Sequence, residues 1–110
     1  MAKSDDEFFV EVVRSAGTVL VTVSGELDAD TAPELNRNLV HVDAGSGRVV
    51  LDLRAVSFCD SVGLASVVAV VRRGADLRVV GSRPVVRLIT LAGMDHHVTF
   101  AASVAEALDS

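Results

Sequence analysis

The 110-residue chain has no tryptophan and no tyrosine, only four phenylalanines, and a single cysteine. With so few aromatic side chains, the core must be built from Val, Ala and Leu, which favours strands and closely packed helices. Cys59 has no partner for an internal disulfide, and no Cys/His spacing resembles a zinc site. We therefore predict one compact domain over residues 1–110, in a reducing compartment and without a metal or another cofactor.

The chain also lacks an excess of positive charge and a long apolar run. Its formal net charge of −5 argues against nucleic-acid binding, which needs a basic face. The longest apolar stretch, Val62–Val71, is about half as long as the ~20 residues of a membrane span. The acidic residues 1–7 do not resemble a signal peptide and are predicted to form a flexible tail. We expect a cytoplasmic protein that binds neither nucleic acid nor membrane.

Hydrophobic periodicity predicts alternating strands and helices along the whole chain. Strands are predicted at 8–14, 18–24, 48–53, 77–81 and 98–101. Helices are predicted at 31–42, 61–73, 82–92 and from 103 onward, with capping boxes at Thr31/Glu34 and Ser103/Glu106. This order indicates an α/β fold with a mixed, mostly parallel sheet of about five strands and about four helices packed on it.

The segment Phe58–Ala65 carries the most specific signal. An apolar run arrives at Asp60-Ser61 and a predicted helix leaves, so Ser61 lies at a helix N-terminus. The helix dipole and free N–H groups there would favour a phosphate on Ser61. Gly63 lowers the profile of the first turn, which would let a partner approach closely. The alternative is that Asp60 or Ser61 only caps the helix.

The sequence Phe58-Cys59-Asp60-Ser61-Val62-Gly63-Leu64 resembles the phosphorylation motif of STAS-domain anti-sigma factor antagonists, commonly Phe-x-Asp-Ser-Ser-Gly-Leu. The stretch 25–32 is similar to that family's first loop and helix start, and the stretches 91–95 and 103–108 to its C-terminal part. The likeness covers nearly the whole chain in the right order, so it is more specific than any single motif.

The resemblance implies a binding switch and not an enzyme. Such a protein, when unphosphorylated, captures an anti-sigma factor that is also a serine kinase of the histidine-kinase-like ATPase type, and so frees a sigma factor for transcription. The phosphorylated form releases the kinase, and a serine phosphatase resets the switch. A monomer or weak dimer is expected.

The resemblance also assigns roles to residues. Ser61 is the phosphate acceptor, Asp28 faces an Arg of the partner, and Asp60 lies beside Ser61 at the docking surface. The expected partner-binding set, ordered along the chain, is Gly25, Glu26, Asp28, Asp60, Ser61, Val62, Gly63 and Leu64.

Two positions depart from the family pattern. Val62 stands where a second Ser is common, which leaves Ser61 as the single acceptor of the motif. Ala65 stands where Gly is common, which bears on how closely a partner can approach.

Other chemistries fit less well. A serine hydrolase with a nucleophile elbow would need Gly where Cys59 stands, and none of His41, His96 and His97 is singled out as a base. Adjacent histidines on a strand point to opposite faces, which disfavours a shared metal ion. A STAS domain with another role stays open: an unphosphorylated scaffold in a stress-signalling complex, or a regulatory subunit of a lipid ABC transporter.

Overall fold

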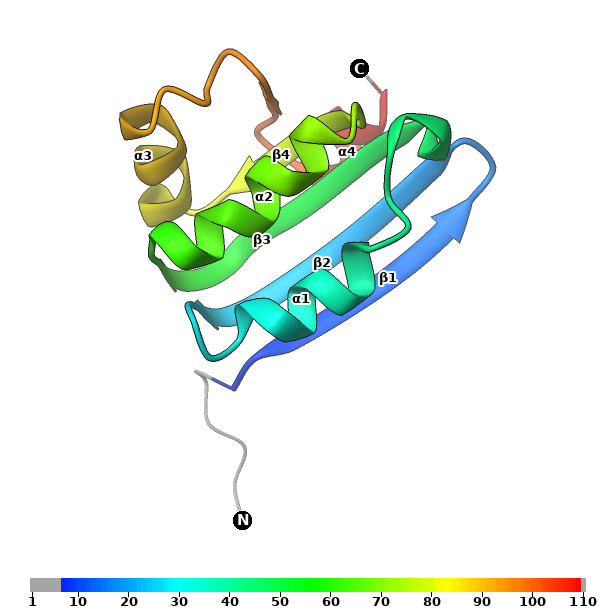
Figure 1. Ribbon diagram of the computed structural model, residues 1–110. Helices are drawn as coiled ribbons and strands as arrows, with labels where there is room; N and C mark the ends of the chain where they lie inside the picture. Colours follow the sequence, from blue (N-terminus) through cyan, green and yellow to red (C-terminus); the bar gives the residue numbers. More distant parts are fainter. Residues whose placement is uncertain (1–6, 110) are drawn as a thin grey trace.

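The computed structural model describes residues 7–109, and the predicted tail lies outside this range except for Glu7. Within it the α/β fold is confirmed (Figure 1). No helix among these residues combines the length and apolarity that a membrane span needs. The elements in chain order are β1 (Phe9–Ser15), β2 (Thr18–Leu27), α1 (Ala32–Leu39), the 3-10 turn η1 (Ala44–Ser46), β3 (Arg48–Cys59), α2 (Ser61–Arg72), β4 (Asp76–Gly81), α3 (Arg83–Leu91), β5 (Thr99–Phe100) and α4 (Val104–Asp109).

The five strands form one mixed sheet in the order β1-β2-β3-β4-β5. Strands β1 and β2 are antiparallel and joined by a short turn, whereas the other three neighbouring pairs are parallel. Each parallel connection runs through a helix, as such connections require. The predicted mixed, mostly parallel sheet is therefore confirmed.

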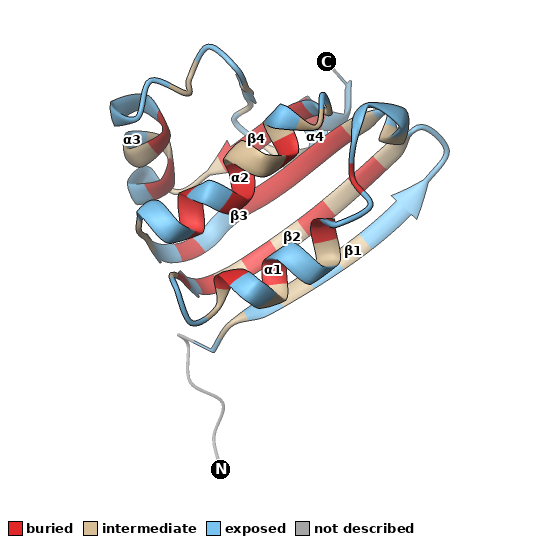
Figure 2. Ribbon diagram, viewed as in Figure 1, coloured by how far each residue is buried: buried red, intermediate tan, exposed pale blue. Residues whose placement is uncertain are grey.

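Helices cover both faces of the sheet unequally. Helices α1, α2 and α3 pack on one face, where the main core lies, and α4 packs on the other face against Val50 and Val80 (Figures 1 and 2). Because β2 and β3 carry buried Val and Leu side chains on the main core face, they hold the centre of the fold. The fully buried large side chains are Leu27, Leu35, Leu39, Leu51, Leu53, Ile89, Val21, Val23, Val42, Val49, Val50 and Val56.

Strands β2 and β3 run further than the sequence pattern predicts. The predicted ends at 24 and 53 are wrong, because pairing continues to Leu27 opposite Cys59. Two register shifts each place one extra residue in β3, between the pairs Thr22–Asp52 and Ser24–Ala55, and again before Phe58. These bulges break the alternation of buried and exposed residues. Both strands consequently end beside the start of α2.

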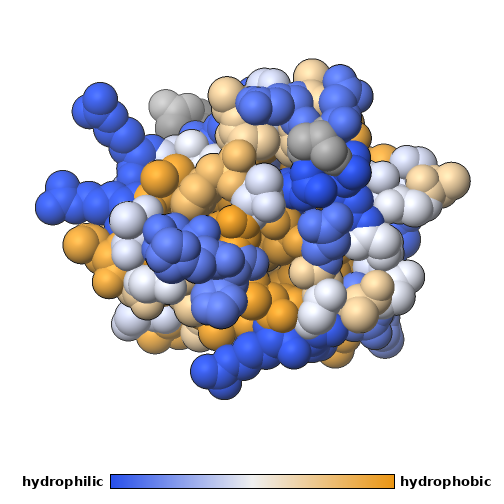
Figure 3. All heavy atoms as spheres, turned by 90° about the horizontal axis from the view of Figure 1, so that it is seen from above, coloured by the Kyte–Doolittle hydropathy of each residue, from blue (hydrophilic) through white to orange (hydrophobic). Residues whose placement is uncertain are grey.

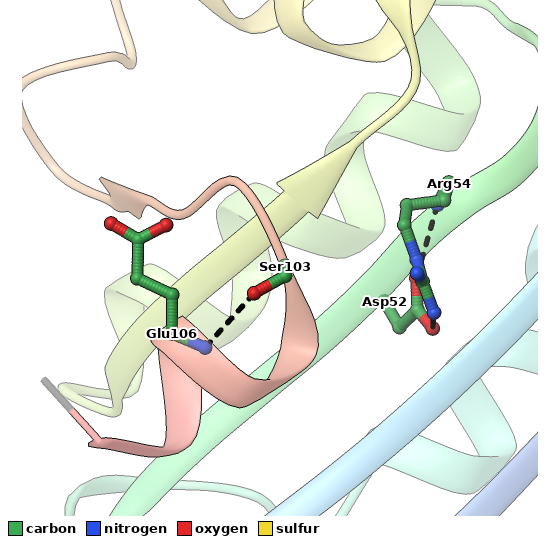
Figure 4. Close-up of polar contacts among 4 residues, drawn as sticks. All are labelled: Asp52, Arg54, Ser103 and Glu106. Atoms are coloured by element: carbon green, nitrogen blue, oxygen red, sulfur yellow. Dashed lines mark hydrogen bonds and ion pairs between the residues drawn. The ribbon is translucent and has the colours of Figure 1, made fainter.

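The predicted capping boxes are only partly formed. Thr31 makes no side-chain cap to α1, so that box is wrong. At α4, Glu106 N–H donates to Ser103 Oγ at 3.1 Å (Figure 4), while the Glu106 carboxylate accepts from Ala102 N–H at 2.7 Å instead of from Ser103. The Ser103/Glu106 pattern therefore located the start of α4 correctly, whereas the Thr31/Glu34 pattern predicted a side-chain cap that α1 does not have.

Candidate functional site

Helix α2 is capped by Asp60 and not by Ser61. Asp60 has an extended backbone (φ −106°, ψ −175°), and its Oδ1 atom accepts the N–H of Gly63 at 2.9 Å. Its carbonyl oxygen accepts the N–H of Leu64, also at 2.9 Å. Asp60 therefore satisfies one of the free N–H groups of the first turn with its side chain and accepts the first bond of the helix with its carbonyl.

Ser61, the first residue of α2, is exposed and its hydroxyl is uncommitted. Within residues 7–109 its Oγ atom has no hydrogen-bond partner, and therefore no base that would activate it as a nucleophile. The N–H groups of Ser61 and Val62 still face outward at the positive end of the helix dipole. The geometry allows a kinase to reach the hydroxyl and the helix to tolerate a phosphate on it.

Gly63 is buried and allows β2 to approach α2 within the same chain. A Cβ atom at this position would lie 2.4 Å from the carbonyl oxygen of Leu27 and 2.8 Å from its Cγ atom. No side chain fits at that distance, so only glycine permits this contact. Gly63 thus meets Leu27 of its own chain, and Leu64 beside it is buried as well.

The end of β2 is also hydrogen-bonded to the residue that caps α2. The N–H of Asp60 donates to the carbonyl oxygen of Leu27 at 3.2 Å. Leu27 is fully buried, and it lies opposite Cys59 in the sheet. The two predicted site segments, 25–28 and 60–64, are therefore brought together through Leu27.

A compact turn follows Leu27 and is held by Asp28 and Thr31. Asp28 Oδ1 accepts the N–H groups of Asp30 at 3.0 Å and Thr31 at 3.2 Å. Thr31 Oγ1 accepts the N–H of Asp28 at 2.9 Å and donates to the carbonyl oxygen of Glu26 at 2.7 Å. The carboxylate expected to face a partner thus also supports its own loop.

The predicted partner-binding residues differ in exposure. Gly25 is buried, and its φ of 98° is in the left-handed region that favours glycine at the second bulge. The exposed members of the set are Glu26, Ser61 and Val62; the half-buried members are Asp28 and Asp60; the buried members are Gly25, Gly63 and Leu64.

Phe58 is a surface residue that the sequence analysis did not include in the site. It is 47% exposed and lies opposite Glu26 on β2, while Val62 in the first turn of α2 is 48% exposed. Large apolar side chains at such exposure suit a protein interface. The signal was present, since Phe58 opens the motif; its exposure depends on the bulge, which the pattern does not reveal.

A hollow of about 360 Å³ starts at Ser61 and continues along α2. It is lined by one face of the helix, with Ala65, Val68 and Ala69 between Ser61 at one end and Arg72 at the other. Small side chains at these positions leave the helix backbone close to the surface. The surface around Ser61 therefore extends along the outside of α2.

Cys59 is half-buried beside this site. Burial, with a smaller contribution from the negative charge of Asp60, raises the pKa of the thiol to about 11. At neutral pH the thiol stays protonated and is a poor nucleophile. Cys59 instead packs against the main core.

A second polar arrangement lies on the sheet face that carries α4 (Figure 4). Arg54 donates through Nε and Nη2 to the two carboxylate oxygens of Asp52, each at 2.8 Å. The hydrogen bonds from Arg54 hold the pKa of the buried Asp52 carboxyl below its ordinary value, against the opposing effect of burial. The pair borders a hollow of about 320 Å³. The sequence analysis did not identify it.

Apolar side chains also gather at the end of the molecule seen from above, ringed by hydrophilic ones (Figure 3). Helix α3 ends on this side, and its last residue, Leu91, is 73% exposed.

Comparison with known proteins identifies the family. The model of the STAS domain matches residues 9–107. An anti-sigma factor antagonist from Mycobacterium paratuberculosis is 32% identical, with a TM-score of 0.83 over 98% of this chain and 97% of that one. A putative antagonist from Thermotoga maritima is 19% identical, with a TM-score of 0.79 over 91% and 92% of the two chains.

The Bacillus cell-fate determinant SpoIIAA in its phosphorylated form is 22% identical, with a TM-score of 0.69 over 94% of this chain and 97% of that one. The likenesses to the Thermotoga and Bacillus proteins are evidence for the fold alone. No curated protein matches the chain in sequence. With nearly all of its described residues matched, the chain belongs to the STAS domain family, and its structural neighbours are anti-sigma factor antagonists.

Proposed function

We propose that the protein is a cytoplasmic anti-sigma factor antagonist that works as a phosphorylation-controlled binding switch. Unphosphorylated, it captures an anti-sigma factor with serine kinase activity of the histidine-kinase-like ATPase type, and thereby frees a sigma factor. Phosphorylation at Ser61 ends the complex, and a serine phosphatase restores the binding form. The observation that carries this proposal is the exposed, uncommitted Ser61 hydroxyl beside a helix cap made by Asp60.

The comparisons support this role. The Mycobacterium paratuberculosis relative is described as an anti-sigma factor antagonist, and SpoIIAA has been solved in a phosphorylated form. The family is generally non-enzymatic. The proposed docking surface consists of the exposed Glu26, Ser61 and Val62, with the half-buried Asp28 and Asp60 at its edge and the buried Gly25, Gly63 and Leu64 beneath.

The switch acts by changing the docking surface while the domain keeps its fold. The free N–H groups at the start of α2 offset part of the phosphate charge, so the modified helix stays intact. A partner shaped around a neutral hydroxyl instead meets up to two negative charges. Two like unit charges about 6 Å apart at an effective dielectric near 20 repel by roughly 3 kcal/mol, a hundredfold in affinity. Desolvation of the phosphate adds to this cost.

The proposal is tested by phosphorylation with purified anti-sigma factor kinases of the same organism. Mass spectrometry should place one phosphate on Ser61, and none should remain after Ser61→Ala. Ser57 is the matched control, because it is also exposed and lies four residues earlier on β3. A chain that is modified elsewhere, or that binds none of the kinases in either form, would contradict the proposal.

A further inference from the structure

The connection between β4 and α3 is a single residue, Ser82, which donates two hydrogen bonds to β3. We propose that Ser82 is a positioning residue of the switch. By holding the end of β3, it fixes the place of Ser61 at the proposed docking surface and of Phe58 beside it. The inference rests on the proposed function, because correct placement is measured through binding of the partner and phosphorylation of Ser61.

The pairing of β3 with β4 ends before β3 does. Leu53 opposite Gly81 is the last pair between these strands, whereas β3 continues to Cys59. Ser82 follows directly and takes the place of a further strand residue. Its N–H donates to the carbonyl oxygen of Leu53 at 3.3 Å, and its Oγ donates to the carbonyl oxygen of Val56 at 2.7 Å. The two bonds of Ser82 therefore span the first bulge of β3.

The Ser82 hydroxyl is used for β3 and not for its own helix. Ser82 directly precedes the first turn of α3 and has an extended backbone (φ −72°, ψ 165°). A serine at this position usually caps the helix with its side chain, but Ser82 forms no such bond. Removal of the hydroxyl should therefore affect the end of β3 and leave the hydrogen bonds of α3 unchanged.

Val56 is the point at which β3 is anchored between its two bulges. It is 1% exposed and packs in the main core. The second bulge follows at once, because Val56 pairs with one residue of β2 and Phe58 with the next. A bulge leaves its extra residue out of the ladder, so β2 alone holds this stretch weakly. The bond from Ser82 to the Val56 carbonyl fixes the start of the second bulge from the β4 edge.

A shift at Val56 reaches Ser61 through a short stretch with a fixed register. The N–H of Asp60 donates to the carbonyl oxygen of Leu27 at 3.2 Å, next to the last pair between β2 and β3. This bond depends on the register of the residues that follow Val56. A shift in this stretch would move Phe58 relative to β2 and displace Asp60, the cap that directly precedes Ser61.

Three substitutions at Ser82 grade the strength of its bond to Val56. Ser82→Thr keeps the hydroxyl, Ser82→Cys replaces it by a weak donor, and Ser82→Ala removes it. Ser103→Ala is the matched control. The Ser103 hydroxyl also makes one hydrogen bond, which it accepts from the N–H of Glu106, but it serves α4 on the other face of the sheet.

Two kinds of measurement are made on each variant. Amide hydrogen exchange of the free protein is measured at residues 57–60 and at Glu106. Affinity, and kcat/KM for phosphorylation of Ser61, are measured with the anti-sigma factor kinase that binds wild type.

We expect Ser82→Ala to exchange the amides of residues 57–60 faster than wild type does. It should also lose about tenfold in affinity and in kcat/KM, because a misplacement of about 1 Å is sufficient for such a loss. Ser82→Thr should remain within about twofold of wild type, and Ser82→Cys should lie between the two. Ser103→Ala should exchange faster at Glu106 alone and bind as wild type does, although it too loses stability.

Wild-type affinity in Ser82→Ala would overturn the inference. Lower affinity without faster exchange would overturn it as well, because Ser82 would then contact the partner itself. A Ser103→Ala variant that binds as weakly as Ser82→Ala would show that general destabilisation is sufficient. If circular dichroism shows that Ser82→Ala is unfolded, Ser82→Cys is compared with Ser82→Thr, and equal values for these two overturn the inference.

Failure of the proposed function gives a different result. In that case wild type neither binds an anti-sigma factor kinase nor accepts phosphate on Ser61. The exchange rates still decide whether Ser82 holds the end of β3, because they are measured on the protein alone. Faster exchange at residues 57–60 in Ser82→Ala, but not in Ser82→Thr or Ser103→Ala, supports positioning even then; equal rates in all variants overturn it.

Discussion

Asp60 binds the N–H of Gly63 at 2.9 Å, and this single bond leaves the hydroxyl of the intervening Ser61 free. A helix start of this kind divides two tasks between neighbours, since the cap maintains the helix while the next residue is open to modification. Removing the Asp60 side chain should therefore lower stability, whereas removing the Ser61 hydroxyl should abolish switching and leave stability unchanged.

Substitution at Asp60 should lower stability, whereas substitution at Ser61 should not. Asp60→Ala removes the cap and should cost about 1 kcal/mol in the free energy of unfolding. For a domain of this size that corresponds to a fall of roughly 4–8 °C in Tm. Ser61→Ala should leave Tm within about 1 °C of wild type, because surface changes away from such features cost little. Thermal unfolding followed by circular dichroism measures both, and equal Tm values for the two variants would argue against this division.

Phosphorylation should change binding and leave folding intact. Protein carrying phosphate on Ser61 should keep its Tm within a few degrees while its affinity for the partner falls by about a hundredfold. Ser61→Ala should bind constitutively, and Ser61→Asp should bind less tightly than wild type but better than the phosphorylated form, because one carboxylate carries less charge. Calorimetry of unmodified and modified protein tests this. A collapse of Tm on phosphorylation would instead indicate that the switch unfolds the domain.

Phe58 should contribute to binding and little to stability. As a 47% exposed side chain beside the proposed docking surface, it can be replaced by Ser at small cost to folding. If the partner covers it, Phe58→Ser should weaken binding by about tenfold or more. Val13→Ser is the control, because Val13 is similarly exposed at 50% and lies opposite Leu20, toward the other end of β1. Equal binding by both variants would remove Phe58 from the interface.

Gly63 should tolerate no side chain. Gly63→Ala places a Cβ against the backbone oxygen of Leu27 and should cost about 1–3 kcal/mol, as overpacking of a buried contact does. Gly45→Ala is the comparison, because its Cβ would lie 3.3 Å from a movable side-chain atom of Asp43. Urea unfolding should show a large loss for the first variant and a small one for the second.

The Asp52–Arg54 pair should make stability depend on acid pH. Arg54 lowers the pKa of Asp52 in the folded protein, so the stabilisation is present above the unfolded pKa near 3.8 and is lost as pH falls through the lower folded pKa. Arg54→Met leaves the buried carboxylate unpaired at pH 7 and should cost about 1–3 kcal/mol there. The deficit should shrink in acid, where Asp52 becomes protonated. A deficit that is constant with pH would contradict an ionic role.

Sequence periodicity was sufficient for the architecture because the buried strands carry uninterrupted or alternating apolar side chains. The runs Val19–Val23 and Val49–Leu53 pack on the main core as their patterns indicate. Periodicity failed beyond residue 53, where Arg54, Ala55 and Ser57 look like a loop although they belong to β3. A bulge interrupts alternation without ending a strand, so no local pattern separates it from a connection.

Contacts between distant segments account for what the sequence could not provide at the site. The motif located Ser61, but the choice between Asp60 and Ser61 as cap depends on side-chain geometry that spacing does not fix. Similarly, Thr31 matches a capping box by spacing. Its hydroxyl instead accepts the N–H of Asp28 and donates to the carbonyl of Glu26. The space that Gly63 leaves is occupied by Leu27, more than thirty residues earlier.

The two bulges of β3 act as a pair. Each extra residue shifts by one the numbering of the residues that face the main core, and the second shift cancels the first. Leu53 faces the main core before the bulges, Val56 does so between them, and Cys59 does so after them. Deleting one residue from 54–58 would therefore remove one bulge and leave Cys59 opposite Leu27. Length variants in this stretch should keep the end of β3 in place when Val56 still fills its core position, and should lose stability when Ala55 or Ser57 takes that position.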